Sequence, residues 1–317
     1  MADALPTVLA DTPLPAGLHE LLDGRVQLAP WESLERDDFS ADGVYTFGHP
    51  RVDGPLLDRL RGVRVISNFG VGLDHIDVAA AAARGIPVGY TPAILDGATA
   101  DMGFALLMAA ARRLAEGDRF ARSPAFTVYR PDRMLGREIH HSTLGIVGLG
   151  RIGQQVARRA AGFEMRVLYT DHVPLAEAEA ALGVAWRPLE TLLAEADYVM
   201  LTLPLTKQTR GLIGREQLRQ MKRTATLINI ARGPIVDTEA ITQALQEDWI
   251  YAAALDVTDP EPLPRDHPLL SLDNLTITPH LGSATEQTRA AMERLSADNL
   301  LAGLRGAPLP CPAAVSL

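Results

Sequence analysis

Short apolar runs alternate with amphipathic stretches along most of the chain, a pattern typical of parallel α/β proteins. In roughly the first hundred residues the apolar runs are four or five residues long, and helical stretches separate them. We expect strands at Thr7–Ala10, Arg25–Leu28, Gly43–Phe47, Val63–Ile66 and Ile86–Val88, and helices at Leu14–Leu22, at Gly54–Arg61 and through Ala79–Ala83. This part of the chain is therefore predicted to form one small α/β unit.

The same alternation returns in the second half of the chain, with more strands. We expect strands at Leu144–Val147, Arg166–Thr170, Tyr198–Leu201, Ala225–Ile230, Tyr251–Leu255 and Leu275–Thr278. The expected helices are Arg151–Ala161, Leu175–Leu182, Leu189–Glu195, Arg215–Met221 and Thr238–Glu247. Six strands with intervening helices predict a Rossmann dinucleotide-binding fold.

Two further helices are expected outside these repeats. The stretch Ala98–Ala115 is apolar on nearly all faces, which predicts burial between domains or subunits, and the polar, irregular segment Arg119–His141 after it predicts an extended arm. Ser283 and Glu286 form an S-x-x-E capping box, which predicts a helix to about Arg305 that returns to the first unit. We therefore expect a two-lobed protein with one domain of residues 1–97 and 282–317 and another of residues 98–281.

A glycine-rich turn follows the first strand of the second unit. Gly148, Gly150 and Gly153 spell G-x-G-x-x-G directly before a predicted helix. Such glycines permit a tight turn, a close approach of a pyrophosphate and close helix packing, and the helix N-terminus offers unpaired N–H groups to phosphate. Asp171 ends the next strand, 23 residues after Gly148, where a ribose-binding carboxylate is expected. The alternative is an ordinary βαβ turn in which Asp171 is a surface cap.

The composition narrows the class of protein. Of 317 residues, 47% are hydrophobic and 22% charged, which indicates a globular chain. The net charge of −9 and the low aromatic content argue against nucleic acid as a partner. Cys311 is the only cysteine, so neither a disulfide framework nor a thiolate metal site is expected. The N-terminal stretch has no signal-peptide pattern and no apolar run could span a bilayer, so we expect no membrane contact and a cytoplasmic protein.

Three polar residues follow predicted strands of the second unit. Arg232 follows Ala225–Ile230, Glu261 lies in a proline-rich loop after Tyr251–Leu255, and His280 follows the last strand. Since the carboxyl ends of parallel strands meet at one edge, the three can converge on the ligand of the glycine turn. Singly they could be a surface charge, a loop residue and a core histidine. Together they favour a site in which Arg232 binds a carboxylate and His280 transfers a proton.

Glu261 is expected to keep the imidazole of His280 oriented and charged. His280 stands just before the predicted capped helix, whose N-terminal end disfavours a positive ring. A carboxylate within hydrogen-bond distance has the larger effect, so we expect the carboxylate to outweigh the helix.

In the first unit, Asn68–Gly72 interrupts the pattern with two glycines around Val71, directly after a predicted strand. Exposed N–H groups in such a turn can hold a carboxylate. A plain strand-to-helix connection explains the segment equally well.

With these motifs, the chain resembles the D-isomer-specific 2-hydroxyacid dehydrogenases and, within them, the glyoxylate/hydroxypyruvate reductases. The resemblance covers nearly the whole chain from about Val63. It rests on the glycine turn and on the runs Gly70–Asp74, Ile230–Gly233, Leu255–Pro264, Pro279–Thr285 and Asn299–Gly306.

The resemblance implies a Rossmann domain and a flavodoxin-like substrate domain, and reduction of a small 2-oxo acid to the D-2-hydroxy acid with a nicotinamide cofactor. It implies Arg232, Glu261 and His280 as the catalytic set, and Val71 and Gly72 as carboxylate-binding residues with Arg232. It implies a homodimer built through the long helix and the arm. We expect no metal at the site. The implied cofactor-binding residues, with the glycine turn, are Thr99, Gly148, Gly150, Arg151, Ile152, Gly153, Asp171, Leu203, Pro204, Thr209, Ile230, Asp256, His280 and Gly282.

Several points stay open on the sequence alone. Asp171 favours NAD over NADP, because a carboxylate repels a 2′-phosphate. The arm offers Tyr129, Arg133 and Met134 where some relatives carry a tryptophan, so the resemblance does not define which 2-oxo acid is selected. D-lactate, phosphoglycerate and phosphite dehydrogenases share most of the motifs, and an NAD-sensing corepressor is the alternative outside enzymes.

Overall fold

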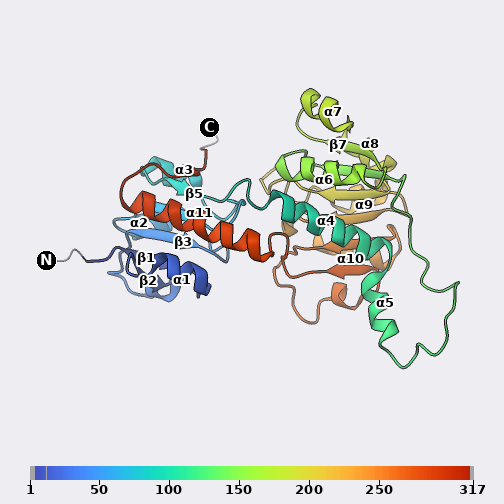
Figure 1. Cartoon of the computed structure of the whole chain (residues 1–317), viewed down its shortest axis with the longest axis horizontal. Coiled ribbons are helices and arrows are strands. Elements are labelled where there is room, and N and C mark those ends of the chain that lie inside the picture. The colour runs from blue at the N-terminus through green and yellow to red at the C-terminus, as the bar shows by residue number, and fades with distance from the viewer. Residues whose placement is uncertain (1–3, 12, 315–317) are drawn as a thin grey trace. The chain divides into compact units, whose positions relative to one another are not determined.

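The computed structural model describes residues 4–11 and 13–314, which divide into two compact units (Figure 1). Unit 1 comprises residues up to Leu95 together with those from Thr285 onward, and unit 2 is Asp96–Ala284. The predicted division at 97/98 and 281/282 differs from this one by two to three residues. None of the helices in the described residues is both long and apolar enough to cross a membrane.

Unit 1 is a five-stranded parallel sheet in the order β2-β1-β3-β4-β5, the flavodoxin-like order. Helices α1 and α11 pack together, and α11 crosses β3, β4 and β5, while α2 and α3 pack together with α3 against β5. The strands are β1 Thr7–Ala10, β2 Gln27–Pro30, β3 Gly43–Thr46, β4 Val65–Asn68 and β5 Val88–Gly89. The helices are α1 Ala16–Leu22, α2 Gly54–Arg59, α3 Val78–Ala83 and α11 Glu286–Leu304.

Unit 2 is a seven-stranded parallel sheet in the order β12-β11-β10-β9-β6-β7-β8. Its strands are β6 Thr143–Val147, β7 Arg166–Thr170, β8 Ala185–Trp186, β9 Tyr198–Leu201, β10 Thr226–Asn229, β11 Ala252–Leu255 and β12 Leu275–Ile277. Its helices are α4 Asp96–Ala111, α5 Leu114–Ala121, α6 Arg151–Ala161, α7 Ala176–Leu182, α8 Leu189–Glu195, α9 Arg215–Gln220 and α10 Thr238–Gln246.

The strands of unit 2 bury alternate side chains in two cores on opposite faces of the sheet. Val199 and Leu201 of β9 lie in the core under α8, α9 and α10, whereas Tyr198 and Met200 lie in the core under α4, α6 and α7. A sheet buried on both faces explains why its strands read as continuous apolar runs. The strand order reverses between β6 and β9, and ligands of open α/β sheets bind at that reversal, beyond the carboxyl ends of the strands.

The α/β prediction is confirmed, and four details of it are wrong. The predicted helix Ala98–Ala115 is two helices, because Arg113 adopts the left-handed conformation (φ 53°) between α4 and α5. The predicted arm therefore begins inside α5, which ends at Ala121. The two-residue strand β8 was not predicted, because two residues are too short to carry a periodic signal.

The fourth error concerns the last helix. Its N-cap is Thr285, whose side chain accepts a hydrogen bond from Thr288 N, rather than Ser283 of the predicted capping box. The helix thus begins at Glu286, two residues later than an N-cap at Ser283 predicts. The helix packs on β3, β4 and β5, as a helix returning to unit 1 should.

Candidate active site

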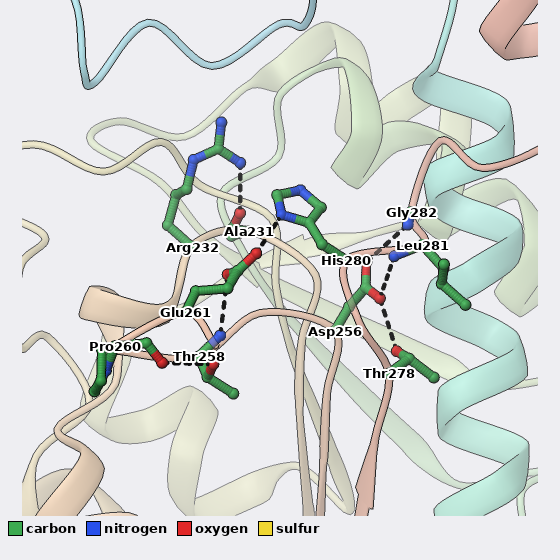
Figure 2. A network of polar contacts seen from close by, with 10 residues as sticks. All are labelled: Ala231, Arg232, Asp256, Thr258, Pro260, Glu261, Thr278, His280, Leu281 and Gly282. Atoms are coloured by element: carbon green, nitrogen blue, oxygen red, sulfur yellow. Dashed lines mark hydrogen bonds and ion pairs between the residues drawn. The ribbon is translucent and has the colours of Figure 1, made fainter. Parts of the chain in front are cut away.

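The turn after β12 carries His280, and a buried carboxylate fixes that turn (Figure 2). Asp256, which follows β11, is only 2% exposed. One of its oxygens accepts hydrogen bonds from Thr278 Oγ1 and Leu281 N at 2.7 Å, and the other accepts from Gly282 N at 2.7 Å. His280 N donates to the carbonyl of Asp256 at 2.9 Å. The turn around His280 is therefore held from both the carboxylate and the backbone of one residue.

His280 and Glu261 form the central pair of the site. His280 Nδ1 lies 2.7 Å from Glu261 Oε1, with 31% and 41% of the two side chains exposed. Because an ionised carboxylate only accepts, Nδ1 carries the proton of this bond, and a proton passed to a reacting group would come from Nε2. The N–H of Thr258 donates to the other carboxylate oxygen of Glu261 at 3.3 Å. Both peptide bonds flanking this stretch, Asp259-Pro260 and Glu261-Pro262, are cis.

Arg232 is carried by the turn after β10. Asn229, fully buried at the end of β10, donates from Nδ2 to Arg232 O at 2.9 Å and accepts from Ala231 N at 3.0 Å. The guanidinium of Arg232 donates from Nη1 to Ala231 O at 2.9 Å. Figure 2 shows the side chains of Arg232 and His280 projecting to the same side of their turns.

Gly233 joins the turn of Arg232 to the loop of Glu261. A Cβ at Gly233 would lie 1.9 Å from Thr258 O, so only glycine permits this contact between the two backbones. Thr258 in turn donates to Glu261, which pairs with His280. The structure thus brings together the three residues that the sequence analysis placed at neighbouring strand ends.

The glycine turn lies where the strand order reverses, between β6 and α6. Gly148 has φ +93°, and a Cβ there would collide with the backbone and Cβ of Leu203 at 2.8–2.9 Å. A Cβ at Gly153 would lie 2.3 Å from Gly148 O, which explains the third glycine. A Cβ at Gly150 would point into open space, with no atom within 4 Å. The turn therefore leaves room at Gly150, where the phosphates of a dinucleotide would approach.

Asp171 follows β7 and faces this turn. Its carboxylate accepts hydrogen bonds from Leu149 N and His172 N, both at 2.8 Å. Trp186 of β8, which the sequence analysis missed, donates from Nε1 to the carbonyl of Asp171 at 3.2 Å. Nearby in β7, burial raises the pKa of Tyr169, and its hydroxyl donates to Glu179 at 3.2 Å.

The remaining predicted cofactor residues lie on several elements of unit 2. A Cβ at Gly282 would lie 3.2 Å from Asp256 Oδ2 and 3.4 Å from Thr99 Cγ2, so these three residues meet. Thr209 closes its loop by donating to Pro204 O at 2.8 Å. By contrast, the side chain of Ile230 lies in the core under α4, and Ile152 packs against the same core.

In unit 1, Val71 and Gly72 lie in a turn that a buried amide holds. Asn68, 1% exposed, donates from Nδ2 to Gly70 O at 3.1 Å and to Gly72 O at 3.0 Å, and accepts from Thr46 Oγ1 at 2.8 Å. Within residues 4–11 and 13–314, no protein acceptor is found for the N–H groups of Val71 and Gly72. The turn can therefore offer donors to an anion.

The described residues also contain no group of three or more His, Cys, Asp or Glu side chains arranged to hold a metal ion.

Known proteins place the chain in a family. Residues 104–282 match the model of the D-isomer specific 2-hydroxyacid dehydrogenase NAD binding domain. A glyoxylate reductase of Pyrococcus furiosus is 43% identical over 95% of this chain and 93% of its own. A crystal structure of a Thermus thermophilus protein aligns with a TM-score of 0.89 at 44% identity, over 97% of this chain and all of the other.

A structure from Sinorhizobium meliloti is that of an NADPH-dependent glyoxylate/hydroxypyruvate reductase in complex with NADP and malonate. It aligns with a TM-score of 0.88 at 30% identity, over 98% of this chain and 97% of the other. The family model covers more than half of this chain, and the Pyrococcus relative nearly all of it. The chain therefore belongs to the D-isomer-specific 2-hydroxyacid dehydrogenases, a family of oxidoreductases with a nicotinamide-dinucleotide-binding domain.

Proposed function

We propose that the protein reduces glyoxylate to glycolate, or hydroxypyruvate to D-glycerate, and that NADH is its preferred cofactor. The pair of His280 Nδ1 and Glu261 Oε1 at 2.7 Å is the observation that carries this proposal. It assigns Nδ1 to Glu261 and keeps an anion against the ring, so a proton given to the substrate would come from Nε2. The names of relatives at 41–49% identity, all glyoxylate reductases, support the substrate class.

The glycine turn fits a dinucleotide, because the direction in which a Cβ of Gly150 would point is open space. The bound cofactor supplies a hydride. Arg151, at the start of α6, would bind its pyrophosphate, and Asp171 would accept hydrogen bonds from the ribose hydroxyls. Thr99, Asp256 and Gly282 would line the same site, with the other cofactor residues named above. Asp171 supports NADH over NADPH, because its carboxylate repels a 2′-phosphate.

Arg232 would bind the carboxylate of the substrate through its planar fork, which matches two oxygens at once. The N–H groups of Val71 and Gly72 would bind carboxylate oxygens as well. His280 would give the proton on Nε2 to the oxygen of the reduced carbonyl, while Glu261 stabilises the protonated ring.

We also propose that two copies of the chain form a dimer through α5 and the arm after it. Five of the exposed large apolar side chains lie there, at 49–77% exposure, and a lone soluble chain seldom carries such a patch. These residues are Leu114, Phe126, Val128, Tyr129 and Leu135. Light scattering after size exclusion would give the mass, and a monomer at micromolar concentration would contradict the dimer.

Initial rates with a panel of 2-oxo acids and both reduced cofactors test the function. We expect the highest kcat/KM with glyoxylate or hydroxypyruvate and NADH, and D-glycerate from hydroxypyruvate by chiral chromatography. Preference for pyruvate or phosphohydroxypyruvate would assign a different dehydrogenase of the family. Equal kcat/KM with NADPH would remove the role of Asp171, and binding of NADH without turnover of any 2-oxo acid would favour a cofactor-sensing protein.

The variant Arg232→Lys tests the substrate anchor. Lysine keeps the charge and loses the fork, so kcat/KM for glyoxylate should fall about a hundredfold while the Kd of NADH stays within twofold. Arg223→Lys is the matched control, because Arg223 is exposed at the other end of β10. Wild-type efficiency in Arg232→Lys would show that Arg232 does not bind the substrate.

A further inference from the structure

Two arginine–aspartate pairs join helices α4 and α6, which pack against each other. Arg151 donates from Nε to Asp96 Oδ2 at 2.7 Å, and Arg159 donates from Nε to Asp101 Oδ1 at 2.6 Å. Arg159 also donates from Nη2 to Gly97 O at 3.1 Å, so α4 is already tied to α6 without Arg151. The first pair is therefore not needed merely to hold the helices together.

The two pairs are built in opposite ways. In the first pair the acid is buried and the arginine reaches out, with side-chain exposures of 8% for Asp96 and 63% for Arg151. In the second pair Asp101 is 69% exposed and Arg159 only 26%. The second pair, with an exposed acid and a shielded arginine, is a common surface contact. In the first pair the buried acid cannot move freely, so it fixes the exposed arginine.

Asp96 has Arg151 as its charge partner. Its Oδ1 is buried and has no hydrogen-bond partner within residues 4–11 and 13–314, so the bond from Arg151 Nε is its one strong donor there. Its place at the start of α4 adds the favourable end of the helix dipole. A buried carboxylate is costly without a charge partner, so the pair holds Arg151 in one place.

Arg151 is held next to the glycine turn. It is the first residue of α6, directly after Gly150, whose Cβ direction is open. Because a guanidinium is planar, a fixed Nε direction also sets where Nη1 and Nη2 point. Those two nitrogens make no hydrogen bond to the described residues and lie on an exposed side chain. An arginine fixed in this way loses less rotamer freedom when it binds an anion.

We propose that Asp96 is a positioning residue: it holds Arg151 by Nε so that Nη1 and Nη2 can bind the pyrophosphate of the cofactor. This inference rests on the proposed function, in which Arg151 contacts that pyrophosphate. The opposite expectation is that Asp96 repels the phosphates, since it adds a negative charge near them. When the charge of Asp96 is removed, positioning predicts weaker binding of the cofactor and repulsion predicts tighter binding.

The test measures the Kd of NADH by fluorescence titration and of ADP-ribose, which keeps the pyrophosphate, by calorimetry. Asp96→Asn keeps the shape and removes the charge, and we expect both ligands to bind about five- to tenfold more weakly, with kcat at saturating NADH within twofold of wild type. Asp101→Asn is the matched control, since it breaks the other pair between the same helices, and both Kd values should stay within twofold. Tm values of all variants show whether each one is folded.

A double variant separates positioning from other effects. If Asp96 acts through Arg151, the double variant Arg151→Ala/Asp96→Asn should bind NADH with the same Kd as Arg151→Ala alone. Asp96→Glu keeps the charge, and NADH should bind within about threefold of wild type, whereas a loss as large as in Asp96→Asn would overturn the role of the ion pair.

Unchanged or tighter binding in Asp96→Asn, or losses that add in the double variant, would also overturn the proposal. If Arg151→Ala weakens NADH but Asp96→Asn does not, the positioning role fails and the cofactor site stands. If wild-type protein does not bind NADH, the proposed function itself fails.

Discussion

The turn of Val71 and Gly72 in unit 1 and the turn of His280 in unit 2 are held by opposite chemistry. In unit 1 the amide of Asn68 donates to the carbonyls of Gly70 and Gly72, so the oxygens of the turn are occupied and its N–H groups remain for a ligand. In unit 2 the carboxylate of Asp256 accepts from Leu281 N and Gly282 N, so the N–H groups are occupied and the side chain of His280 is presented.

The difference shows that the buried residue beneath a turn decides what the turn can do. An amide that binds carbonyls suits a turn for anions, and a carboxylate that binds N–H groups suits a turn that orients one side chain. Replacing the carboxylate under His280 by an amide should lower kcat. Replacing the amide under Val71 and Gly72 by a carboxylate should raise KM.

The largest effect is expected from Asp256→Asn. An amide has one accepting oxygen, and its NH2 group would face an N–H donor where the second carboxylate oxygen stood. We expect the free energy of unfolding to fall by about 2–4 kcal/mol and kcat/KM for glyoxylate to fall about a hundredfold. Chemical denaturation and initial rates measure the two effects. Asp266→Asn, exposed in the segment between β11 and β12, is the control.

Wild-type kcat in Asp256→Asn would show that the turn keeps His280 in place without the carboxylate of Asp256.

The next effect is expected from Asn68→Asp. A carboxylate cannot donate to Gly70 O and Gly72 O, and its charge would repel an anionic substrate. We expect KM for glyoxylate to rise about tenfold or more, with a smaller change in kcat and no change in the Kd of NADH. Asn274→Asp is the matched control, because Asn274 also donates to a backbone carbonyl, Leu245 O, but lies before β12. An unchanged KM would remove Val71 and Gly72 from substrate binding.

Much of this arrangement could be predicted from the sequence. Strands buried on both faces leave continuous apolar runs, so β7 and β9 are predicted to the residue, and α6 and α8 likewise. Arg232, Glu261 and His280 could be placed together because parallel strands end at a common edge. The glycine turn could be predicted from its G-x-G-x-x-G spacing.

The parts that could not be predicted depend on contacts between distant residues. No glycine or proline marks the break at Arg113, and the two residues of β8 show no period. In the sequence, Asn229 and Asn68 look like ordinary residues at strand ends, so their hydrogen bonds to nearby backbone could not be predicted. Gly233 carries no signal of the backbone of Thr258 that it must approach, and Asp96 shows no sign of Arg151, 55 residues later.

A third effect, of intermediate size, is expected from Glu261→Gln. The glutamine keeps the shape and replaces the ionised acceptor, 2.7 Å from His280 Nδ1, by a neutral one. A hydrogen bond to a neutral oxygen is weaker than one to a carboxylate, so the ring should be held less firmly, and kcat for glyoxylate should fall about five- to tenfold with KM within about threefold of wild type.

Glu138→Gln is the matched control for Glu261→Gln. It removes an exposed carboxylate at 2.8 Å from His140, a second histidine–glutamate pair of unit 2, and should leave kcat and KM unchanged. Wild-type kcat in Glu261→Gln would show that the carboxylate of Glu261 is not needed to orient His280.

The smallest effects should come from the hydroxyls that support the two buried residues. Thr278 donates to Asp256 at 2.7 Å and Thr46 donates to Asn68 at 2.8 Å. Valine in either position keeps the shape and deletes one donor, while the other bonds of Asp256 or Asn68 remain. A single hydrogen bond contributes about 0.5–1.5 kcal/mol, so the free energy of unfolding should fall by that amount in each variant.

The kinetic effects of the two valine variants should nevertheless differ. Thr278→Val should lower kcat two- to fivefold with little change in KM, because it loosens the turn of His280. Thr46→Val should raise KM for glyoxylate by a similar factor with little change in kcat, because it loosens the turn of Val71 and Gly72. If both variants changed kcat and KM alike, one turn would not serve to orient His280 and the other to bind the anion. The difference between Asp256 and Asn68 would then concern only how each turn folds.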